Sequence, residues 1–372
     1  MRLVNLTRNS VILPAVLALA GCLDDGGSGG DDTSLGQLNY NGIGGLTYQT
    51  RSQRSKTSTQ GEFRYYPGET LSLWVGDLHL VDGVPAQRYV TPLEFIPENR
   101  AALSNPIADD EGLSTHTLRE QQLLDNRVVR NITRLLLALN WTGDVRKGEK
   151  IDIRDRVITQ LNNALPTLSA PIDFTVTEAE FAESDAGLSP ANQLLAAICF
   201  YPEDHPLCDE PPTEAEIALA PEEPANEEER DPDVSYREDL QSIRDAILDA
   251  IRNLDEVSPE DVETYIEREL TAITTAVSNT YYLDEDVASH PASDTGLKSV
   301  RIRLIGGEAQ LADVEALSTR SDQVVIHAAD WQRSELEYFV AGDTGGESEL
   351  VVSFRPDDTY RWIRKQLRVL IR

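Results

Sequence analysis

The sequence predicts an α+β protein in which two β-rich segments flank a mostly helical middle. Residues 40–95 and 298–371 contain short runs of β-branched and aromatic residues that alternate with polar ones, separated by turns rich in glycine and proline. Between them, apolar residues recur at spacings of three and four, which is the period of an amphipathic helix. We expect an N-terminal β-sandwich plus helices, an acidic linker, a helical hairpin and a C-terminal Ig-like β-sandwich.

The N-terminal 21 residues have the features of an export signal. Arg2 and Arg8 provide positive charge before the apolar run Val11–Leu19. That run is too short to span a bilayer, which needs roughly 20 apolar residues. Residues 1–21 are therefore expected to be a signal peptide that is removed, after which no apolar run of spanning length remains.

The tetrapeptide Leu19-Ala20-Gly21-Cys22 resembles the lipobox of bacterial lipoproteins. The resemblance implies cleavage before Cys22 and acylation of its thiol and amine, so Cys22 is the expected lipid-attachment site. Because Leu23 and not an aspartate follows the cysteine, the resemblance favours the outer membrane, on its periplasmic or its cell-surface face. The alternatives are an ordinary secretory signal with a chance cysteine, or an amphipathic helix.

The chain is strongly acidic. Its formal net charge is −31, and loss of residues 1–21 removes two arginines and no acidic residue, which gives about −33 for the mature chain. Such a charge repels nucleic acid and anionic lipid headgroups. We therefore expect no nucleic acid partner and no electrostatic membrane binding; the acidic surface serves solubility, or suits metal cations or basic partners.

The first folded module is expected over residues 40–100, after a tether over residues 22–39. Asp24–Ser34 is rich in glycine and aspartate, which is typical of a flexible segment. The run Thr70–Val75 alternates apolar and polar residues, with Pro67-Gly68 and Gly76-Asp77 as flanking turns. This pattern predicts a small antiparallel β-sandwich.

A second resemblance covers this module. Gly45–Tyr48, Gly61–Tyr65, Pro67–Thr70, Val75–Leu78 and Val90–Leu93 look like a module of bacterial envelope lipoproteins that is similar to transthyretin-like and carboxypeptidase-regulatory-like sandwiches. The resemblance implies a structural or binding accessory without catalytic residues of its own.

A helical region is expected over residues 101–201. Its clearest apolar stripe contains Leu124, Val128, Ile132, Leu135 and Leu139. Asn131–Leu136 also resembles the helix that follows the module in its relatives, where an acidic loop able to bind calcium comes next. Here that loop is Asn140–Asp144, which has lost most of the oxygen ligands, so we expect no metal site.

Two cysteines remain besides Cys22. An exported chain folds in an oxidising compartment, so Cys199 and Cys208 are expected to form a disulfide. A metal site that uses both sulfurs and His205 is the alternative, but the spacing fits no zinc motif.

The next two segments differ sharply in composition. Residues 202–235 are predicted to be an acidic, proline-rich linker, because Pro202–Asp233 carries thirteen acidic residues and one arginine. Residues 236–283 are predicted to form a helical hairpin, whose second helix begins at the cap Ser258. Its inner face is expected to contain Val262, Ile266, Leu270, Ile273 and Val277.

The C-terminal segment, residues 296–372, returns to short β-rich runs separated by glycines, which predicts the Ig-like sandwich. Its end is basic: the cations are Arg361, Arg364, Lys365, Arg368 and Arg372. They are expected to pair with acidic residues of the same chain or to face a partner.

No catalytic or cofactor motif is visible. The five histidines lie singly in different segments: His79, His116, His205, His290 and His327. We therefore expect a non-enzymatic envelope accessory, adhesion or assembly factor without cofactors that binds a protein or glycan partner. The alternative is a periplasmic hydrolase or transport-associated component. A deep pocket lined by several of the following residues would favour that alternative: Asp109, Asp110, His116 and Asp144.

Overall fold

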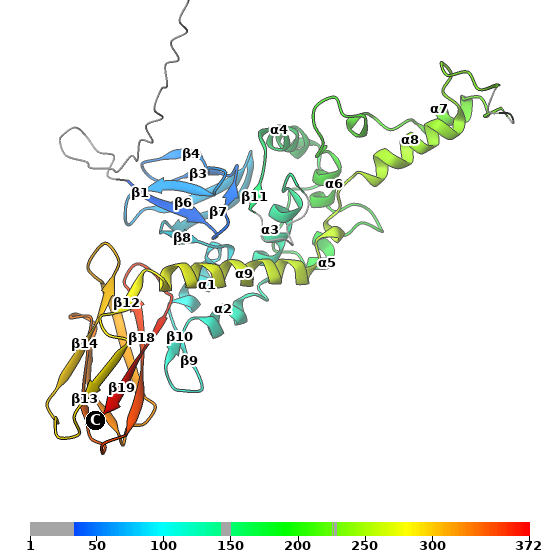
Figure 1. Ribbon diagram of the computed structural model, residues 1–372. Helices are drawn as coiled ribbons and strands as arrows, with labels where there is room; N and C mark the ends of the chain where they lie inside the picture. Colours follow the sequence, from blue (N-terminus) through cyan, green and yellow to red (C-terminus); the bar gives the residue numbers. More distant parts are fainter. Residues whose placement is uncertain (1–32, 143–149, 225, 227–228) are drawn as a thin grey trace, which may run out of the picture. The chain divides into compact units, whose positions relative to one another are not determined.

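The computed structural model describes residues 33–142, 150–224, 226 and 229–372 (Figure 1). The predicted signal peptide, Cys22 and Asp144 lie outside the described residues. Helices and several β-sheets are both present, so the α+β class is confirmed.

The N-terminal module consists of two small sheets. One has the order β5-β1-β8 and the other β4-β3-β6-β7. Their strands are β1 (Ser34–Leu38), β3 (Thr47–Gln49), β4 (Arg54–Lys56), β5 (Glu62–Tyr65), β6 (Thr70–Val75), β7 (Leu78–Pro85) and β8 (Tyr89–Val90). Leu71, Leu73 and Val75 of β6 are buried, whereas the alternate residues Thr70, Ser72 and Trp74 are more exposed, so one face of the strand points into the core as the alternation predicts.

The expected tether ends earlier than predicted. Ser34–Leu38 is strand β1, which pairs antiparallel with β5 and parallel with β8. Leu38 is fully buried in the core, and its burial explains why this segment is ordered. The module therefore begins near residue 34 and not at residue 40.

A short pairing joins this module to the helical region. Strand β2 (Ile43–Gly44) pairs parallel with β11 (Ile151–Asp152). Gly45 follows β2 with φ +88°, and a Cβ there would lie 2.0 Å from the carbonyl oxygen of Ile153. Only glycine permits this close approach of the two backbones.

The region predicted to be helical, 101–201, is mainly helical but also contains β11 and the two-stranded pair β9 (Ile107–Ala108) and β10 (Ser114–Thr115). The helices that lie before or within it are η1 (Pro92–Phe95), α1 (Pro97–Leu103), α2 (Thr117–Leu123), α3 (Arg127–Ala138), α4 (Asp155–Ala164), η2 (Leu165–Thr167), α5 (Glu178–Phe181) and α6 (Pro190–Ala196). Of the predicted stripe, Val128 is half-buried and the other four residues are buried.

The prediction that residues 202–235 are an acidic, proline-rich linker, disordered or a solvated loop, is corrected. This segment contains η3 (Pro206–Cys208) and α7 (Glu214–Leu219). Thr213 and Glu216 form a capping box, and Ile217 is buried. One cap and one apolar anchor are enough to order a short helix that packs against α8 (Arg237–Asp249).

The helical hairpin predicted over 236–283 is also corrected. Helix α8 packs against α7 and η3, whereas α9 (Pro259–Ser278) packs against α3 (Figure 1). Between them lies η5 (Leu254–Glu256), whose Leu254 is fully buried in the N-terminal core. The predicted cap at Ser258 and the five predicted inner-face residues of α9 are confirmed as cap and buried residues.

Helix α9 contributes to two hydrophobic cores. Its N-terminal part packs in the core of the N-terminal module and helices through Val262, Tyr265, Ile266 and Leu270. Its last turns place Ile273 and Val277 in the core of the C-terminal sandwich. A single helix therefore ties the two cores together.

The C-terminal module has two four-stranded sheets around that second core, with orders β12-β14-β17-β16 and β13-β19-β18-β15. Its strands are β12 (Tyr281–Leu283), β13 (Val287–His290), β14 (Lys298–Leu304), β15 (Leu311–Ser318), β16 (Val324–Asp330), β17 (Glu335–Val340), β18 (Glu347–Pro356) and β19 (Ile363–Ile371). The sandwich begins at Tyr281 and not at residue 296, because β12 and β13 each pair with a later strand. None of the described helices has the length and hydropathy needed to cross a membrane.

Candidate functional site

A polar cleft lies between the N-terminal module and the C-terminal sandwich. Its volume is about 830 Å³, which is within the size range of small-molecule sites. One wall comes from the turn at residues 67–70, the end of β7 and helix α1. The opposite wall is the connection between β18 and β19, residues 355–360.

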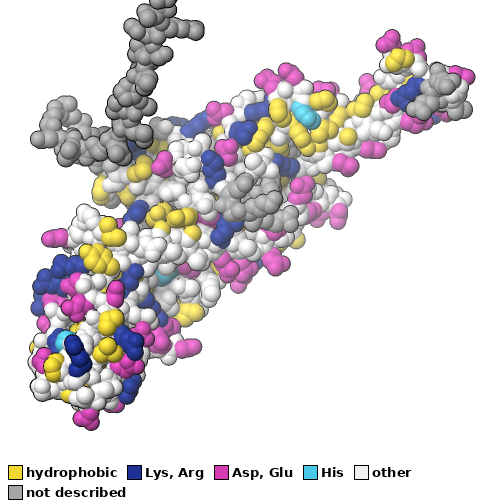
Figure 2. Space-filling model, in the orientation of Figure 1, with side chains coloured by type: hydrophobic (Ala, Val, Ile, Leu, Met, Phe, Trp, Pro, Cys, Tyr) yellow, Lys and Arg dark blue, Asp and Glu magenta, His cyan; other side chains and the backbone are white. Residues whose placement is uncertain are grey.

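Charged side chains of both signs line the cleft. The cations are Arg88, Arg100 and Arg355, and the acidic residues are Glu69, Glu94, Asp357 and Asp358. The cleft is therefore close to neutral. The surrounding surface is more acidic: Figure 2 shows acidic side chains scattered over most of the visible face.

Two of the cations are occupied by nearby backbone groups. The guanidinium of Arg100 donates from Nη1 to the carbonyl oxygen of Glu94 at 2.7 Å. Arg355 Nη1 donates to the carbonyl oxygen of Thr359 at 3.4 Å. Both arginines thus shape the walls of the cleft.

Two of the carboxylates are likewise occupied. Glu94 Oε2 accepts a hydrogen bond from the backbone N–H of Thr91 at 2.9 Å, and Gln87 Nε2 donates to Oε1. Glu69 Oε2 accepts from the backbone N–H of Tyr66 at 2.8 Å. These carboxylates stabilise the start of η1 and the turn after β5.

Asp357, Asp358 and Arg88 have no such partners. Within the described part of the chain, no other residue donates a hydrogen bond to either aspartate carboxylate, and the Arg88 guanidinium donates none. Partial desolvation and the charge of Asp357 raise the pKa of Asp358, while the charge of Arg88 lowers it. The Arg88 guanidinium lies over the ring of Tyr89, 5.4 Å from its centroid, and keeps its N–H donors for a ligand, as the two aspartates keep their acceptors.

Behind the cleft, the connection between β18 and β19 is fixed to the helical region through Arg361. This side chain is 1% exposed, and its Nε lies 3.7 Å from Glu120 Oε1 on α2. Tyr360, whose side chain also lines the cleft, donates its hydroxyl to the same carboxylate oxygen at 2.7 Å. Burial raises the pKa of Glu120, and the charge of Arg361 opposes that rise.

His116 completes this junction. Its Nδ1 accepts a hydrogen bond from the backbone N–H of Trp362 at 3.0 Å, so the proton is on Nε2, which lies 3.0 Å from Thr274 Oγ1 on α9. Burial, together with the charge of Arg361, lowers the pKa of His116 to about 3. We call His116, Glu120, Tyr360, Arg361 and Trp362 the buried junction.

The four residues that could have marked a hydrolase pocket are not gathered in the cleft. Asp109 forms an ion pair with Arg364, whose Nη1 also lies 3.3 Å from Glu111 Oε2. His116 is in the buried junction, Asp110 is exposed, and Asp144 lies outside the described residues. Arg88, Glu94 and Asp358 belong to no sequence motif and were not predicted as site residues; the paired acids in the turn after Pro356 are the one signal that could have marked them.

The basic C-terminal end pairs mostly with its own chain. Arg361 meets Glu120, Arg364 meets Asp109, and Arg368 Nη2 lies 2.6 Å from Glu347 Oε2. For these three arginines the structure therefore shows pairing with acidic residues of the same chain, which was the first of the two alternatives.

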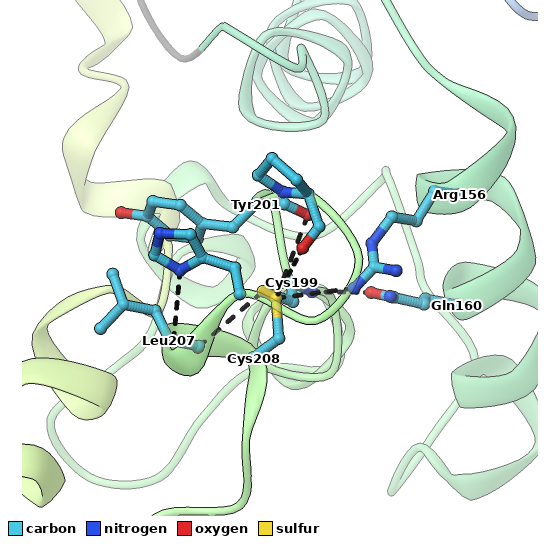
Figure 3. Close-up of a disulfide and its surroundings, with 8 residues drawn as sticks. Arg156, Gln160, Cys199, Tyr201, Leu207 and Cys208 are labelled. Carbon is cyan, nitrogen blue, oxygen red and sulfur yellow. Dashed lines mark hydrogen bonds between the residues drawn. A yellow bond between two sulfur atoms is a disulfide. The ribbon is translucent and has the colours of Figure 1, made fainter.

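Cys199 and Cys208 form the predicted disulfide (Figure 3). Arg156 Nη2 lies 3.5 Å from Cys208 Sγ, and Gln160 accepts from the backbone N–H of Cys199 at 2.7 Å, so α4 supports the bridge. His205 stacks on Tyr201 with ring centroids 4.7 Å apart. Among the described residues no three His, Cys, Asp or Glu side chains gather into a group that could hold a metal ion.

Removal of this disulfide should lower stability moderately. The double substitution Cys199→Ser/Cys208→Ser frees a loop of about ten residues, which costs roughly 2–3 kcal/mol. Urea unfolding of the two proteins measures the difference, and wild-type protein in reductant serves as the control. Equal midpoints for all three samples would contradict the prediction.

Comparisons with known proteins identify no family. No protein-family model and no curated protein matches the chain. One similar solved structure is titled "Crystal structure of the S-layer protein SbsC domains 4 and 5"; it is 14% identical, has a TM-score of 0.20, and covers 25% of this chain and 50% of that chain. The match therefore spans half of that S-layer chain.

Proposed function

We propose that the protein is an outer-membrane-anchored lipoprotein that binds a polar partner in the cleft between its two β-modules, as a non-enzymatic accessory, adhesion or assembly factor of the envelope. The observation that carries the binding role is the 830 Å³ cleft with three charged side chains that have no hydrogen-bond partner among the other residues that the structure describes. The Cys22 lipobox supports the anchoring, and the disulfide is in keeping with an oxidising compartment.

Two connections hold the cleft walls in place, which favours binding by a preformed site. Helix α9 packs into both cores, and the carboxylate of its Glu269 accepts backbone hydrogen bonds from Tyr40 at 2.9 Å and from Asn41 at 2.8 Å. The buried junction fixes the opposite wall to α2. A site held in this way loses little conformational entropy when a ligand enters.

The occupied state of Glu94 argues against a hydrolytic role for the cleft. A general acid or base must be free to reach the substrate with its carboxylate. Glu94 instead uses both oxygens for Thr91 and Gln87, close to its own segment. This leaves Asp357 and Asp358, which are neighbours in one turn and lie on the same wall.

Substitution of Cys22 tests the anchoring. We expect Cys22→Ser to abolish incorporation of a clickable fatty acid and to leave the signal uncleaved, because the thiol is the proposed acylation site. Gel fluorescence and intact mass report both effects. Cys199→Ser should still be labelled as wild type, and equal labelling of Cys22→Ser would rule out the lipoprotein assignment.

Cleft occupancy can be tested without knowledge of the ligand. With Cys22 acylated and the other two cysteines joined in the disulfide, Ser104→Cys places a single thiol on the exposed end of α1, at the edge of the cleft. We expect envelope extract to slow maleimide labelling of this thiol in the full mature chain at least fivefold. Ser299→Cys, on an exposed position of β14, is the matched control and should not change. Equal rates with and without extract at Ser104→Cys would contradict a binding role for the cleft.

A further inference from the structure

We infer that the cleft takes an uncharged saccharide with a free vicinal diol, which Arg88 and Asp358 recognise together. The inference rests on the proposed function and adds the class of ligand. Both side chains line the cleft, and both also line a smaller cavity of about 20 Å³ whose lining includes Arg361.

The charges of the cleft exclude strongly charged and apolar ligands. Three arginines and four acidic residues nearly cancel, and a polyanion would meet four carboxylates on a protein with a net charge of −31. An apolar ligand would displace water from Asp357, Asp358 and Arg88 and leave them without hydrogen-bond partners, which costs free energy at each group. A neutral ligand with many hydrogen-bonding groups is therefore favoured.

The lining of the cleft favours a saccharide over a peptide. Peptides are commonly bound by addition to a sheet edge or by apolar pockets for alternate side chains. Five strands each contribute only one residue to the cleft, at or next to the end of the strand, so no sheet edge runs along it; the rest of the lining is turns, connections, η1 and helix α1. These strand residues are Ser34, Tyr65, Thr70, Pro85 and Arg355. Two tyrosines, Tyr65 and Tyr360, also belong to the lining, and the pKa of each phenol is raised, for both mainly by burial, so each remains protonated at neutral pH.

Adjacent hydroxyl groups match the free side chains of the cleft. A guanidinium is a donor only and an ionised carboxylate is an acceptor only. A vicinal diol presents one oxygen that accepts from Arg88 and a neighbouring O–H that donates to Asp358. Formation of both bonds would supply the partners that these two groups lack within the described chain.

The buried junction offers a second sign that this site is built for polar contacts. Arg361 is buried, lines the smaller cavity beside Asp358, and has two nitrogen atoms, Nε and Nη2, without a hydrogen-bond partner among the described groups. A cavity of this size holds about one water molecule. A water molecule there would connect Arg361 to the floor of the cleft by hydrogen bonds and would add no charge to the cleft. This again favours a neutral ligand.

The Ser104→Cys labelling assay tests the class of ligand with two treated extracts and one pure sugar. Periodate cleaves vicinal diols, whereas a protease removes peptides. We expect protection of the thiol to be lost after periodate, retained after protease, and reproduced by maltohexaose. Arg88→Gln and Asp358→Asn should each raise the amount of extract needed for half of the protection at least tenfold, and Arg301→Gln, on the exposed outer face of β14, should not.

The outcomes separate the two claims. Protection that survives periodate, or that is lost after protease, overturns the saccharide inference and leaves the binding role intact. Unchanged protection in both Arg88→Gln and Asp358→Asn also overturns the inference. No protection by any extract contradicts the proposed function itself.

Discussion

Replacement of Arg361 by alanine should cost about 3–5 kcal/mol of unfolding free energy, because it removes one member of a buried group of charges. Arg361 is 1% exposed and Glu120 is 4% exposed. Without the guanidinium, the carboxyl groups of Glu120 and Glu94 lose the positive charge that opposes the rise of their pKa on burial. Both must then stay protonated or draw water into the core.

The magnitude can be tested against a matched surface arginine. Arg364 lies three residues further along the same segment, and its side chain is 34% exposed while it pairs with Asp109 and Glu111. Arg364→Ala should cost less than about 1 kcal/mol, because water screens exposed ion pairs. Urea unfolding at neutral pH measures both. Adding Glu120→Gln to Arg361→Ala should recover part of the loss. Equal effects of the two alanine substitutions would show that the buried junction carries no special stability.

The sequence was informative where a single local pattern decides the structure. The alternation along β6 and the spacing of Val262, Ile266 and Leu270 in α9 predicted which side chains are buried, because period 2 and period 3.6 hold whatever packs against them. The disulfide was predicted from the expected export signal and the two cysteines that remain besides Cys22. Each of these features depends on neighbours in the chain.

The sequence was misleading where contacts between segments that are distant in the chain decide the structure. The pattern of α9 does not say that Tyr265 packs in one core and Val277 in another, so the helix was assigned to a hairpin with α8. The acid-rich segment around α7 was predicted to be a linker because its composition is polar and charged. Composition does not show that one capping box and one buried residue, Ile217, are enough to form a short helix.

The cleft was missed for the same reason. Arg88 and Asp358 are 270 positions apart in the sequence, and neither belongs to a motif. They become neighbours only when the connection between β18 and β19 is fixed to α2. The spacing of residues along the sequence does not predict that two such distant residues line the same cleft.

His116 should make the protein sensitive to acid. Its pKa in the folded protein is about 3, below the ordinary value of 6.5, so between these two values the unfolded chain binds a proton that the folded chain refuses. Stability attributable to His116 is therefore complete above pH 6.5 and is lost as the pH falls toward 3. A difference of this size corresponds to roughly 4–5 kcal/mol over the whole interval.

Two neighbouring groups act in the opposite sense, so the comparison must isolate the histidine. Burial raises the pKa of Glu94 and that of Glu120, and stability that depends on their protonated forms is lost as the pH rises above about 4.5. His116→Gln keeps a neutral amide that can accept from Trp362 N–H and donate to Thr274, and it leaves both carboxyl groups in place. Unfolding free energies of wild type and His116→Gln, measured from pH 7 to pH 4, should converge or cross as the pH falls, because only in the wild type does unfolding release an imidazole that then binds a proton. Parallel curves over this interval would show that His116 is not held neutral, and that the contacts of its two nitrogens do not exclude a second proton.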